Sequence, residues 1–342
     1  MRVAMYYSNR DVRLEEISSP EIGPGELLVK VHASGICGSD IMEWYRADRV
    51  PLVLGHEIAG EIVSVGEGVE EFRVGDRISA SHHVPCNTCH YCLNGHATVC
   101  ETLRRTHFHP GGFSEYIRLP AINVDRGVYR LPPEVSFEEA TFIEPLACVL
   151  RGQQSAGMRP GRRVLVIGSG IAGLLHIQLA RAMGASRVIA TDISDYRLQA
   201  ARELGADETL HAAEDVPAGL RRLNDGRLAD LVILSTGVPA AIDQGLRSVD
   251  RGGTVLFFAP TPPGERLPIP LNDLFWRNEI TLTSSYAGTP SDHRTALDLI
   301  RARRVRVREM ITHRLGLAET ALGFRLVTEA RESIKVIIEP QR

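Results

Sequence analysis

The 342-residue sequence predicts an α/β protein that contains a doubly wound parallel sheet. Three observations lead to this class. An apolar strand at residues 164–167 runs into a glycine-rich turn and a helical pattern. Strand and helix patterns then alternate, which is typical of parallel sheets. The length allows two domains, each with a sizeable core.

A glycine-rich turn directly follows the apolar strand at residues 164–167. It reads Gly168-x-Gly170-x-x-Gly173, with Ile171 and Ala172 between the last two glycines. Gly168 permits a tight turn, Gly170 lets backbone amides approach a pyrophosphate at a helix N-terminus, and Gly173 lets the helix pack closely on the strand. Together with the flanking strands, the turn predicts a dinucleotide site. A structural βαβ unit with chance glycines is the alternative.

A second strand, 187–191, ends at Asp192, which lies 19 residues after Gly173. A carboxylate there accepts hydrogen bonds from the adenosine ribose hydroxyls and repels a 2′-phosphate, so NAD is favoured over NADP. Arg197 follows closely and could stack on adenine or soften that preference. Further strands are expected at 228–237, 252–260 and 280–286, with a helix at 239–249 between the first two.

Four of the six cysteines occupy one short segment, CNTCHYCLNGHATVC. Closely spaced thiolates can wrap one zinc ion in a closed tetrahedron, so we expect a structural zinc here. Asn94 and Gly95 supply a turn before the last thiol. Disulfides, free buried thiols and an iron–sulfur cluster are the alternatives. The predicted ligands are Cys86, Cys89, Cys92 and Cys100.

Composition narrows the class of protein. Hydrophobic residues make up 44% and charged residues 24%, and the net charge is -3, so nothing favours a nucleic-acid or anionic-membrane partner. The N-terminal segment lacks the apolar region of a signal peptide, and no apolar run reaches about 18 residues. We therefore expect a cytoplasmic protein, in which clustered cysteines bind metal more often than they pair. Lysine occurs only at Lys30 and Lys335.

A second group of potential metal ligands precedes the dinucleotide unit. Thiol, imidazole and carboxylate together form the mixed set that catalytic zinc uses, with a position left open for water or substrate. Ser39 could pass on a proton, and Asp40 is placed to orient a ligating histidine. The candidate ligands are Cys37, His56, Glu57 and Glu144.

Together these motifs resemble the zinc-dependent medium-chain alcohol dehydrogenases, in the branch of sorbitol and threonine dehydrogenases. The resemblance covers nearly the whole chain and depends on GICGSD, GHEIAGEIVSVGEGV, the four-cysteine loop, PGGFSEY, EPLACVL and VIGSGIAG. It implies a GroES-like β-rich catalytic domain, residues 1–147 plus 290–342, and an inserted Rossmann domain, residues 148–289. The active site is then expected in the cleft between them.

The resemblance also assigns roles. Cys37, His56 and Glu144 match ligands of the catalytic zinc, and Glu57 matches a carboxylate that ligates or lies close by. Ser39 matches the hydroxyl that touches the substrate oxygen. One position departs from the pattern: Met42 stands where many relatives have a relay histidine. Met cannot carry a proton, so the relay would end in the cofactor ribose, in water, or at Glu43 or Glu57.

The implied reaction is oxidation of a secondary alcohol to a ketone with hydride transfer to NAD. A polyol, sugar, cyclitol or amino alcohol such as threonine is the expected substrate, and a homo-oligomer, most often a tetramer, the expected assembly. Rival readings are a zinc-free enone or quinone reductase and a non-catalytic nucleotide or redox sensor.

For a few residues the sequence is compatible with more than one role. Glu43 and Trp44 could enter the substrate pocket or lie at the surface, and His107 and His109 could bind substrate or be solvated. His82 and His83 are expected to be loop residues. Arg301 to Met310 is expected to form a helix end and a following strand with solvent-facing arginines.

Overall fold

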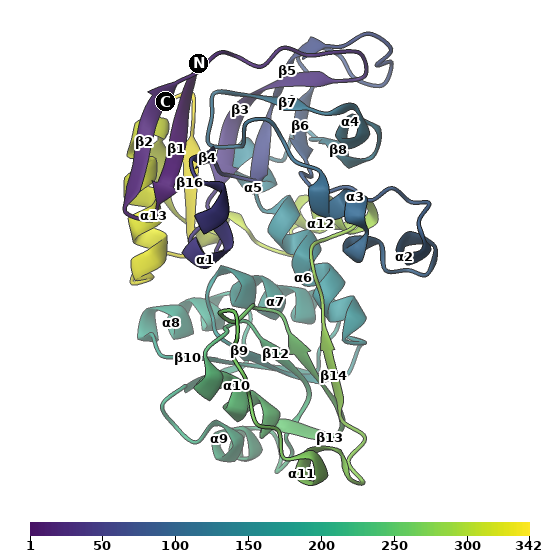
Figure 1. Ribbon diagram of the computed structural model, residues 1–342. Coiled ribbons are helices and arrows are strands. Elements are labelled where there is room, and N and C mark those ends of the chain that lie inside the picture. Colours follow the sequence, from purple (N-terminus) through teal and green to yellow (C-terminus); the bar gives the residue numbers. More distant parts are fainter. The chain divides into compact units, whose positions relative to one another are not determined.

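The computed structural model describes all residues, 1–342, and the chain divides into two compact units (Figure 1). Unit 1 comprises residues 1–147, 287–303 and 307–342, and unit 2 comprises residues 148–286 and 304–306. Helix α6 (Ile143–Ser155) contains the first boundary between them. None of the helices combines the length and apolar character needed to cross a membrane.

Unit 2 is built on one six-stranded sheet in the order β11-β10-β9-β12-β13-β14, and every pair in it is parallel. Numbered within the unit, this is the order 3-2-1-4-5-6 of dinucleotide-binding sheets, whose ligand site lies at the carboxyl ends of the two central strands. The expected strands and their parallel arrangement are thus confirmed. They are β9 (Arg163–Ile167), β10 (Arg187–Asp192), β11 (Glu208–His211), β12 (Ala229–Leu234), β13 (Val249–Phe257) and β14 (Thr281–Ser284).

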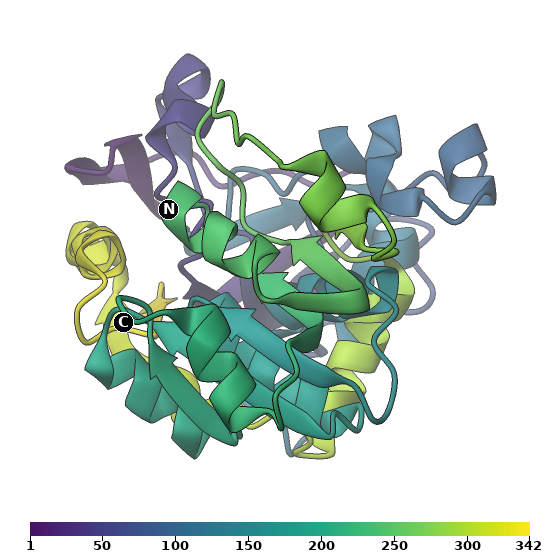
Figure 2. The ribbon, with the colours of Figure 1, turned by 90° about the horizontal axis from the view of Figure 1, so that it is seen from below.

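Helices lie on both faces of this sheet, as Figure 2 shows. Because both faces are covered, the central strands read as unbroken apolar runs, and Leu165, Val166 and Ile233 are fully buried. The helix expected at 239–249 is present but ends earlier. The helices are α7 (Ile171–Ala182), α8 (Asp195–Glu203), α9 (Val216–Leu223), α10 (Pro239–Leu246) and α11 (Leu271–Phe275).

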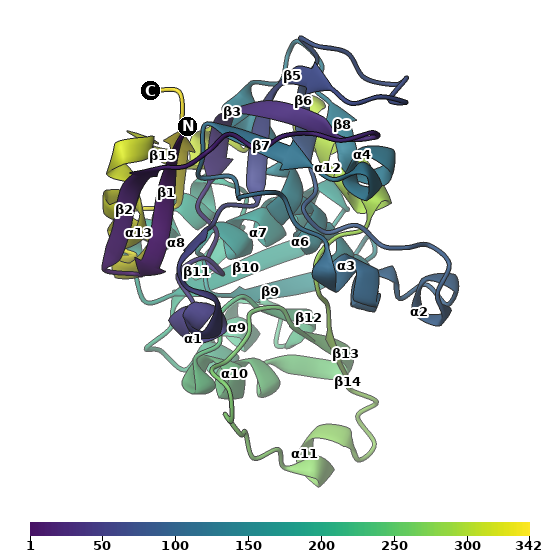
Figure 3. The same ribbon diagram turned by 45° about the horizontal axis from the view of Figure 1, so that its top comes forward.

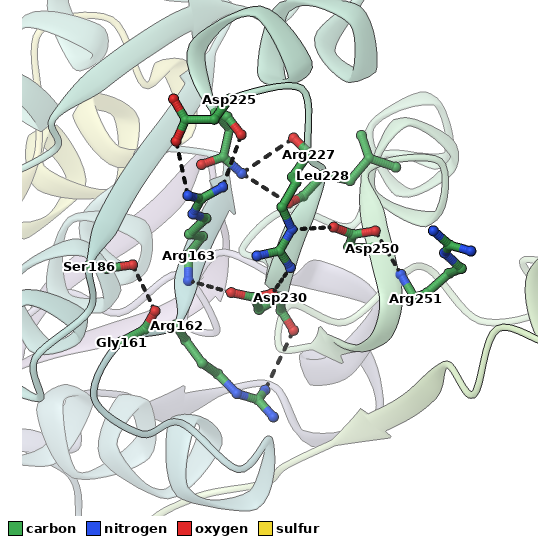
Figure 4. A network of polar contacts seen from close by, with 11 residues as sticks. Gly161, Arg162, Arg163, Ser186, Asp225, Arg227, Leu228, Asp230, Asp250 and Arg251 are labelled. Carbon is green, nitrogen blue, oxygen red and sulfur yellow. Dashed lines mark hydrogen bonds and ion pairs between the residues drawn. The ribbon is translucent and has the colours of Figure 1, made fainter.

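An arginine–aspartate network ties together the amino ends of the central strands (Figure 4). Asp230 accepts a hydrogen bond from the Arg163 backbone N–H at 2.9 Å and from the Arg227 guanidinium at 2.7 Å. The same guanidinium reaches Asp250 at 3.0 Å, and Arg163 reaches Asp225 at 2.9 Å. The guanidinium groups of Arg163 and Arg227 therefore have carboxylate partners, and the network has a structural role at the sheet end opposite the expected ligand site.

Unit 1 is rich in β-structure. A three-stranded sheet has the order β2-β1-β4, and a larger sheet has the order β15-β16-β3-β5-β6-β8, with β7 also paired to β3. The strands are β1 (Arg2–Ser8), β2 (Asp11–Glu16), β3 (Leu27–Gly35), β4 (Leu52–Val53), β5 (Glu57–Val65), β6 (Arg77–Ala80), β7 (Tyr116–Leu119), β8 (Val128–Arg130), β15 (Ile311–Gly316) and β16 (Lys335–Glu339).

The helices of unit 1 are short, apart from α12 and α13. The small helices α2 and α3 form a lobe that stands away from the strands (Figure 3), and few of its side chains are buried. The α-helices are α1 (Glu43–Arg46), α2 (His90–Leu93), α3 (Glu101–Arg105), α4 (Ala121–Gly127), α5 (Phe137–Ala140), α12 (Pro290–Arg301) and α13 (Thr320–Glu329). The 3₁₀ turns are η1 (Ala47–Arg49), η2 (Ala97–Val99), η3 (Arg308–Met310) and η4 (Leu317–Glu319).

The expected strand within 301–310 is wrong. Helix α12 ends at Arg301, the chain turns, and η3 precedes β15. Val305 and Val307 are buried, and the arginines of this segment are exposed, as expected. Arg306 donates to the Glu203 carbonyl at 2.6 Å, and Arg301 pairs with Glu134 at 2.7 Å. Burial therefore alternates over residues 304–308 although the segment pairs with no strand.

Candidate active site

Three strands of unit 1 bring the first group of predicted ligands together. Strand β3 lies between β5 and β16, and its last residue, Gly35, is opposite Glu57 of β5 and Ile337 of β16. Cys37 follows two residues later. A side chain on Gly35 would collide with Glu57 and Lys335, so only glycine leaves room for these two side chains to meet above it.

The turn before β5 positions the histidine. Gly55 has φ +93°, which a residue with a side chain rarely adopts, and a Cβ there would also lie 2.8 Å from the Phe113 nitrogen. With this turn, the possible ligand atoms of Cys37, His56 and Glu57 all lie within 4.8 Å of one another. One sulfur, one nitrogen and one carboxylate oxygen match the donor set of a catalytic zinc site.

Asp40 organises this group from behind. Its buried carboxylate accepts the Cys37 backbone N–H at 2.9 Å and lies 3.4 Å from His56 Nδ1. Burial opposes the charge on His56, but Asp40 and then Cys37 raise the pKa of the imidazole well above its ordinary value. A positive charge at the position of His56 is therefore stabilised by the neighbouring Asp40 carboxylate. The expected placement of Asp40 next to the histidine agrees with these distances.

Lys335 is a member of the site that the sequence did not reveal. Its ammonium forms an ion pair with Glu57 and donates to the Ile36 carbonyl at 3.3 Å, and both charged side chains are almost completely buried. The nearest sequence signal is its rarity, because the chain has only one other lysine. Glu57 therefore belongs to the ligand group and is also the ion-pair partner of Lys335.

The other predicted residues lie in different settings. Glu144, on α6, is buried but does not belong to the group of three ligand atoms. The Ser39 backbone N–H donates to Cys37 Sγ at 3.4 Å. Glu43 accepts the Asn9 backbone N–H at 2.9 Å, which ties it to the surface, and Trp44 is exposed.

A set of imidazoles, His82, His83 and His107, packs next to the ligand group. The rings of His82 and His56 are 4.8 Å apart, those of His82 and His83 are 3.8 Å apart, and those of His83 and His107 are 5.3 Å apart. Burial lowers the pKa of His83 to about 3 and also lowers that of His82, so both are neutral near pH 7. His82 and His83 lie in a loop, as expected, and their rings pack close to one another and to His56. His109 instead forms a backbone bridge to Arg118.

The four-cysteine lobe has the geometry of a closed metal site. Sulfur–sulfur distances are 3.5 Å for Cys89–Cys92, 3.6 Å for Cys100–Cys86 and 3.9 Å for Cys86–Cys92. A tetrahedron with Zn–S bonds of about 2.3 Å requires about 3.8 Å. All four thiols are free of disulfides. Backbone N–H groups, first that of Thr88, lower the pKa of Cys86 to about 5, which favours the thiolate that zinc requires.

The glycine-rich turn of unit 2 forms the expected cradle. Gly168 has φ +90° just after β9, Gly170 is the N-cap residue of α7, and a Cβ on Gly173 would collide with the Gly168 carbonyl. Ile171 and Ala172 begin α7, so their backbone N–H groups are among the unpaired donors at its N-terminus. These donors suit a pyrophosphate.

Two side chains flank this cradle. Asp192, the last residue of β10, accepts the backbone N–H groups of Ser169 at 2.8 Å and Ser194 at 2.9 Å. These bonds fix its carboxylate next to the glycine turn. An Arg197 guanidinium nitrogen lies 3.9 Å from where a Cβ on Gly170 would be, and its Nε is buried without a partner. The Arg197 guanidinium therefore lies beside the glycine-rich turn.

Comparison with known proteins places this geometry in a family. Residues 23–132 match the alcohol dehydrogenase GroES-like domain, and residues 172–302 match the zinc-binding dehydrogenase domain. The chain is 32% identical to sorbitol dehydrogenase of Gallus gallus over 96% of this chain and 93% of that protein. It is 37% identical to L-threonine 3-dehydrogenase of Pyrococcus abyssi over 79% and 78%.

A solved structure of a zinc-binding dehydrogenase from Sinorhizobium meliloti 1021, bound to NADP, is similar over 99% of both chains, with a TM-score of 0.88 and 30% identity. These matches confirm the predicted fold class: a GroES-like domain combined with a Rossmann-type domain. The chain belongs to the zinc-dependent medium-chain alcohol dehydrogenase family.

Proposed function

We propose that this chain oxidises a secondary alcohol to a ketone and transfers the hydride to NAD. The observation that carries the proposal is the convergence of Cys37, His56 and Glu57, backed by Asp40. The sorbitol and threonine dehydrogenases to which the chain is similar indicate a polyol, sugar, cyclitol or amino alcohol as substrate.

Cys37 and His56 would hold the catalytic zinc, with Glu57 or Glu144 as a further ligand. A zinc ion there supplies positive charge that favours loss of a proton from a nearby hydroxyl. Asp40 keeps the His56 ring oriented through Nδ1, which leaves the other nitrogen for the metal. Lys335 offsets the charge of Glu57 while that carboxylate is not needed as a ligand.

The Ser39 hydroxyl would accept the substrate proton. Met42 cannot pass it on, and the Glu43 carboxylate is occupied by the Asn9 N–H. The proton would then leave through water or a cofactor hydroxyl. The interdomain cleft expected from the resemblance stays a prediction.

Gly168, Gly170 and Gly173 would admit the pyrophosphate of the dinucleotide, with Arg197 beside it. Bound NAD supplies the hydride acceptor. The Asp192 carboxylate would accept ribose hydroxyls and repel a 2′-phosphate, which is why we propose NAD over NADP. The four-cysteine lobe would hold a second, structural zinc, because it has little apolar core of its own.

The test is formation of NADH or NADPH from a panel of polyols, cyclitols and amino alcohols, together with zinc analysis. We expect about two zinc per chain and activity with NAD. Cys37→Ser should abolish turnover and remove one zinc, whereas Cys148→Ser, outside both ligand groups, should keep both. A zinc-free protein that reduces enones would favour the reductase. A protein that binds zinc and NAD but oxidises nothing in the panel would favour the sensor.

We also infer a homo-oligomer and a cytoplasmic location. Strand β14 is the edge of the parallel sheet, and the segment before it exposes apolar side chains: Leu271 is 66% exposed and Trp276 is 71% exposed. An edge strand beside such side chains favours pairing with a second copy. Trp276→Glu should reduce the mass measured by light scattering. Leu93→Glu, on an equally exposed leucine of the four-cysteine lobe, should leave it unchanged.

A further inference from the structure

We propose that the substrate carries an anionic group, a carboxylate or a phosphate, and that Arg49 and Arg46 bind it together with His107. This inference depends on the proposed function and narrows its substrate class. The arginines lie on α1 and η1, directly after the segment that provides Cys37 and Asp40.

Arg46 links this surface to the ligand group. Its guanidinium lies 3.7 Å from Asp40 Oδ1 and 3.4 Å from the Ser39 carbonyl oxygen, and the same Asp40 oxygen lies 3.4 Å from His56 Nδ1. A single carboxylate therefore separates Arg46 from a proposed zinc ligand. Its Nε is buried and has no hydrogen-bond partner. An anion bound by Arg46 would lie within one small molecule's length of the metal position.

Arg49 adds a second positive charge, and its guanidinium forms no ion pair. Its guanidinium carbon lies 5.0 Å from the centre of the Tyr45 ring, and that of Arg46 lies 4.6 Å from the same centre. Arg49 is exposed and has no carboxylate within ion-pair distance. The neighbouring Glu43 is bonded to the Asn9 N–H. In contrast, two arginines of the network in Figure 4, Arg163 and Arg227, form ion pairs with aspartates.

The imidazoles complete this surface. The His107 ring lies 5.3 Å from that of His83, in the imidazole set next to the ligand group, and partial burial, then Arg49 and Arg46, lower its pKa. Arg46 acts in the same way on His83. Two guanidinium groups and neutral imidazoles supply the donors of this surface. Asp48 lies on the same turn as Arg49, and the carboxylates of Asp40 and Glu43 already have partners. The planar fork of arginine matches carboxylate and phosphate oxygens, whereas the hydroxyls of a neutral polyol do not require a net charge.

The experiment compares three substrates of one carbon skeleton in the zinc-loaded enzyme: a neutral polyol, the same polyol with a terminal carboxylate, and its terminal phosphate ester. We expect KM for one anionic form to be at least about tenfold below that of the neutral form, which corresponds to about 1.4 kcal/mol. The arm with the lower KM identifies carboxylate or phosphate. Added salt should raise KM for the anionic form alone.

Arg49→Gln is the sharpest variant, because Arg49 does not touch Asp40. It should raise KM for the anionic form about tenfold with little change in kcat. Arg331→Gln removes the same charge from a side chain that is 83% exposed and should leave KM as in the wild type. Calorimetry with inorganic phosphate gives a readout without turnover: the Kd should weaken about tenfold in Arg49→Gln and not in Arg331→Gln.

Oxidation of the neutral polyol with no anionic preference would overturn the inference and leave the proposed function standing. Equal effects of Arg49→Gln and Arg331→Gln would overturn it as well. Failure to oxidise any alcohol, neutral or anionic, would instead count against the proposed function.

Discussion

Replacing Lys335 by methionine tests the buried ion pair beneath the ligand group. The exposed fractions of the Lys335 and Glu57 side chains are 0% and 1%, so water cannot take the place of the lost ammonium. Lys335→Met leaves the Glu57 carboxylate buried without its counter-charge and also removes the donor to the Ile36 carbonyl. Breaking a buried pair in this way costs about 3–5 kcal/mol. For a domain of about 150–250 residues, this lowers Tm by roughly 10 °C.

The assay is thermal and urea unfolding of the zinc-free protein, so that metal binding does not contribute. Lys30→Met is the matched control: it changes the only other lysine, which is half-buried and has no ion pair, and should cost at most about 0.5 kcal/mol. Glu57→Gln in the Lys335→Met background should recover part of the loss, and the double-mutant cycle gives the coupling. A Tm for Lys335→Met within about 2 °C of that of Lys30→Met would refute the reasoning.

Three further predictions concern other parts of the chain. Cys89→Ser should remove about one of two zinc ions per chain, measured by elemental analysis, because three thiolates cannot close the tetrahedron; an unchanged zinc content would contradict the proposed site. Asp192→Ala should raise KM for NAD about tenfold and shrink the preference over NADP, measured by initial rates; an unchanged ratio would count against the ribose role. Burial lowers the pKa of His176 to about 3, so its neutral form stabilises the fold fully above its unfolded pKa of about 6.5. That stability is lost as the pH falls toward 3, by up to about 1.4 kcal/mol per pH unit. His176→Gln should therefore flatten the pH dependence of the free energy of urea unfolding between pH 6.5 and 5. Equal slopes of this free energy against pH in the wild type and the variant would show the reasoning to be wrong.

The local sequence was sufficient to predict a structural feature wherever all the residues that form the feature lie in one segment. The turn from Gly168 to Gly173 depends only on its own backbone conformation. The parallel strands are recognisable as apolar runs because both of their faces are covered. The four-cysteine loop carries all its ligands within 15 residues. In these cases spacing along the chain fixes distance in space, so reading the sequence predicts the structure.

Tertiary structure decided what depends on distant segments. Lys335 meets Glu57 only because β16 pairs with β3, which pairs with β5, across 278 residues of sequence. His82 packs against His56, and His83 against His82, only because their loop folds next to that residue, and no local pattern distinguishes these two from solvated histidines. The alternating valines and arginines of 301–310 predict a strand, but no neighbouring strand pairs with this segment, so it forms a turn and η3 instead. The sequence by itself therefore determined the fold class, the family resemblance and the metal and dinucleotide motifs. The fold alone determined how charges are paired around the proposed zinc, because pairing is set by strand order and not by neighbours in the chain.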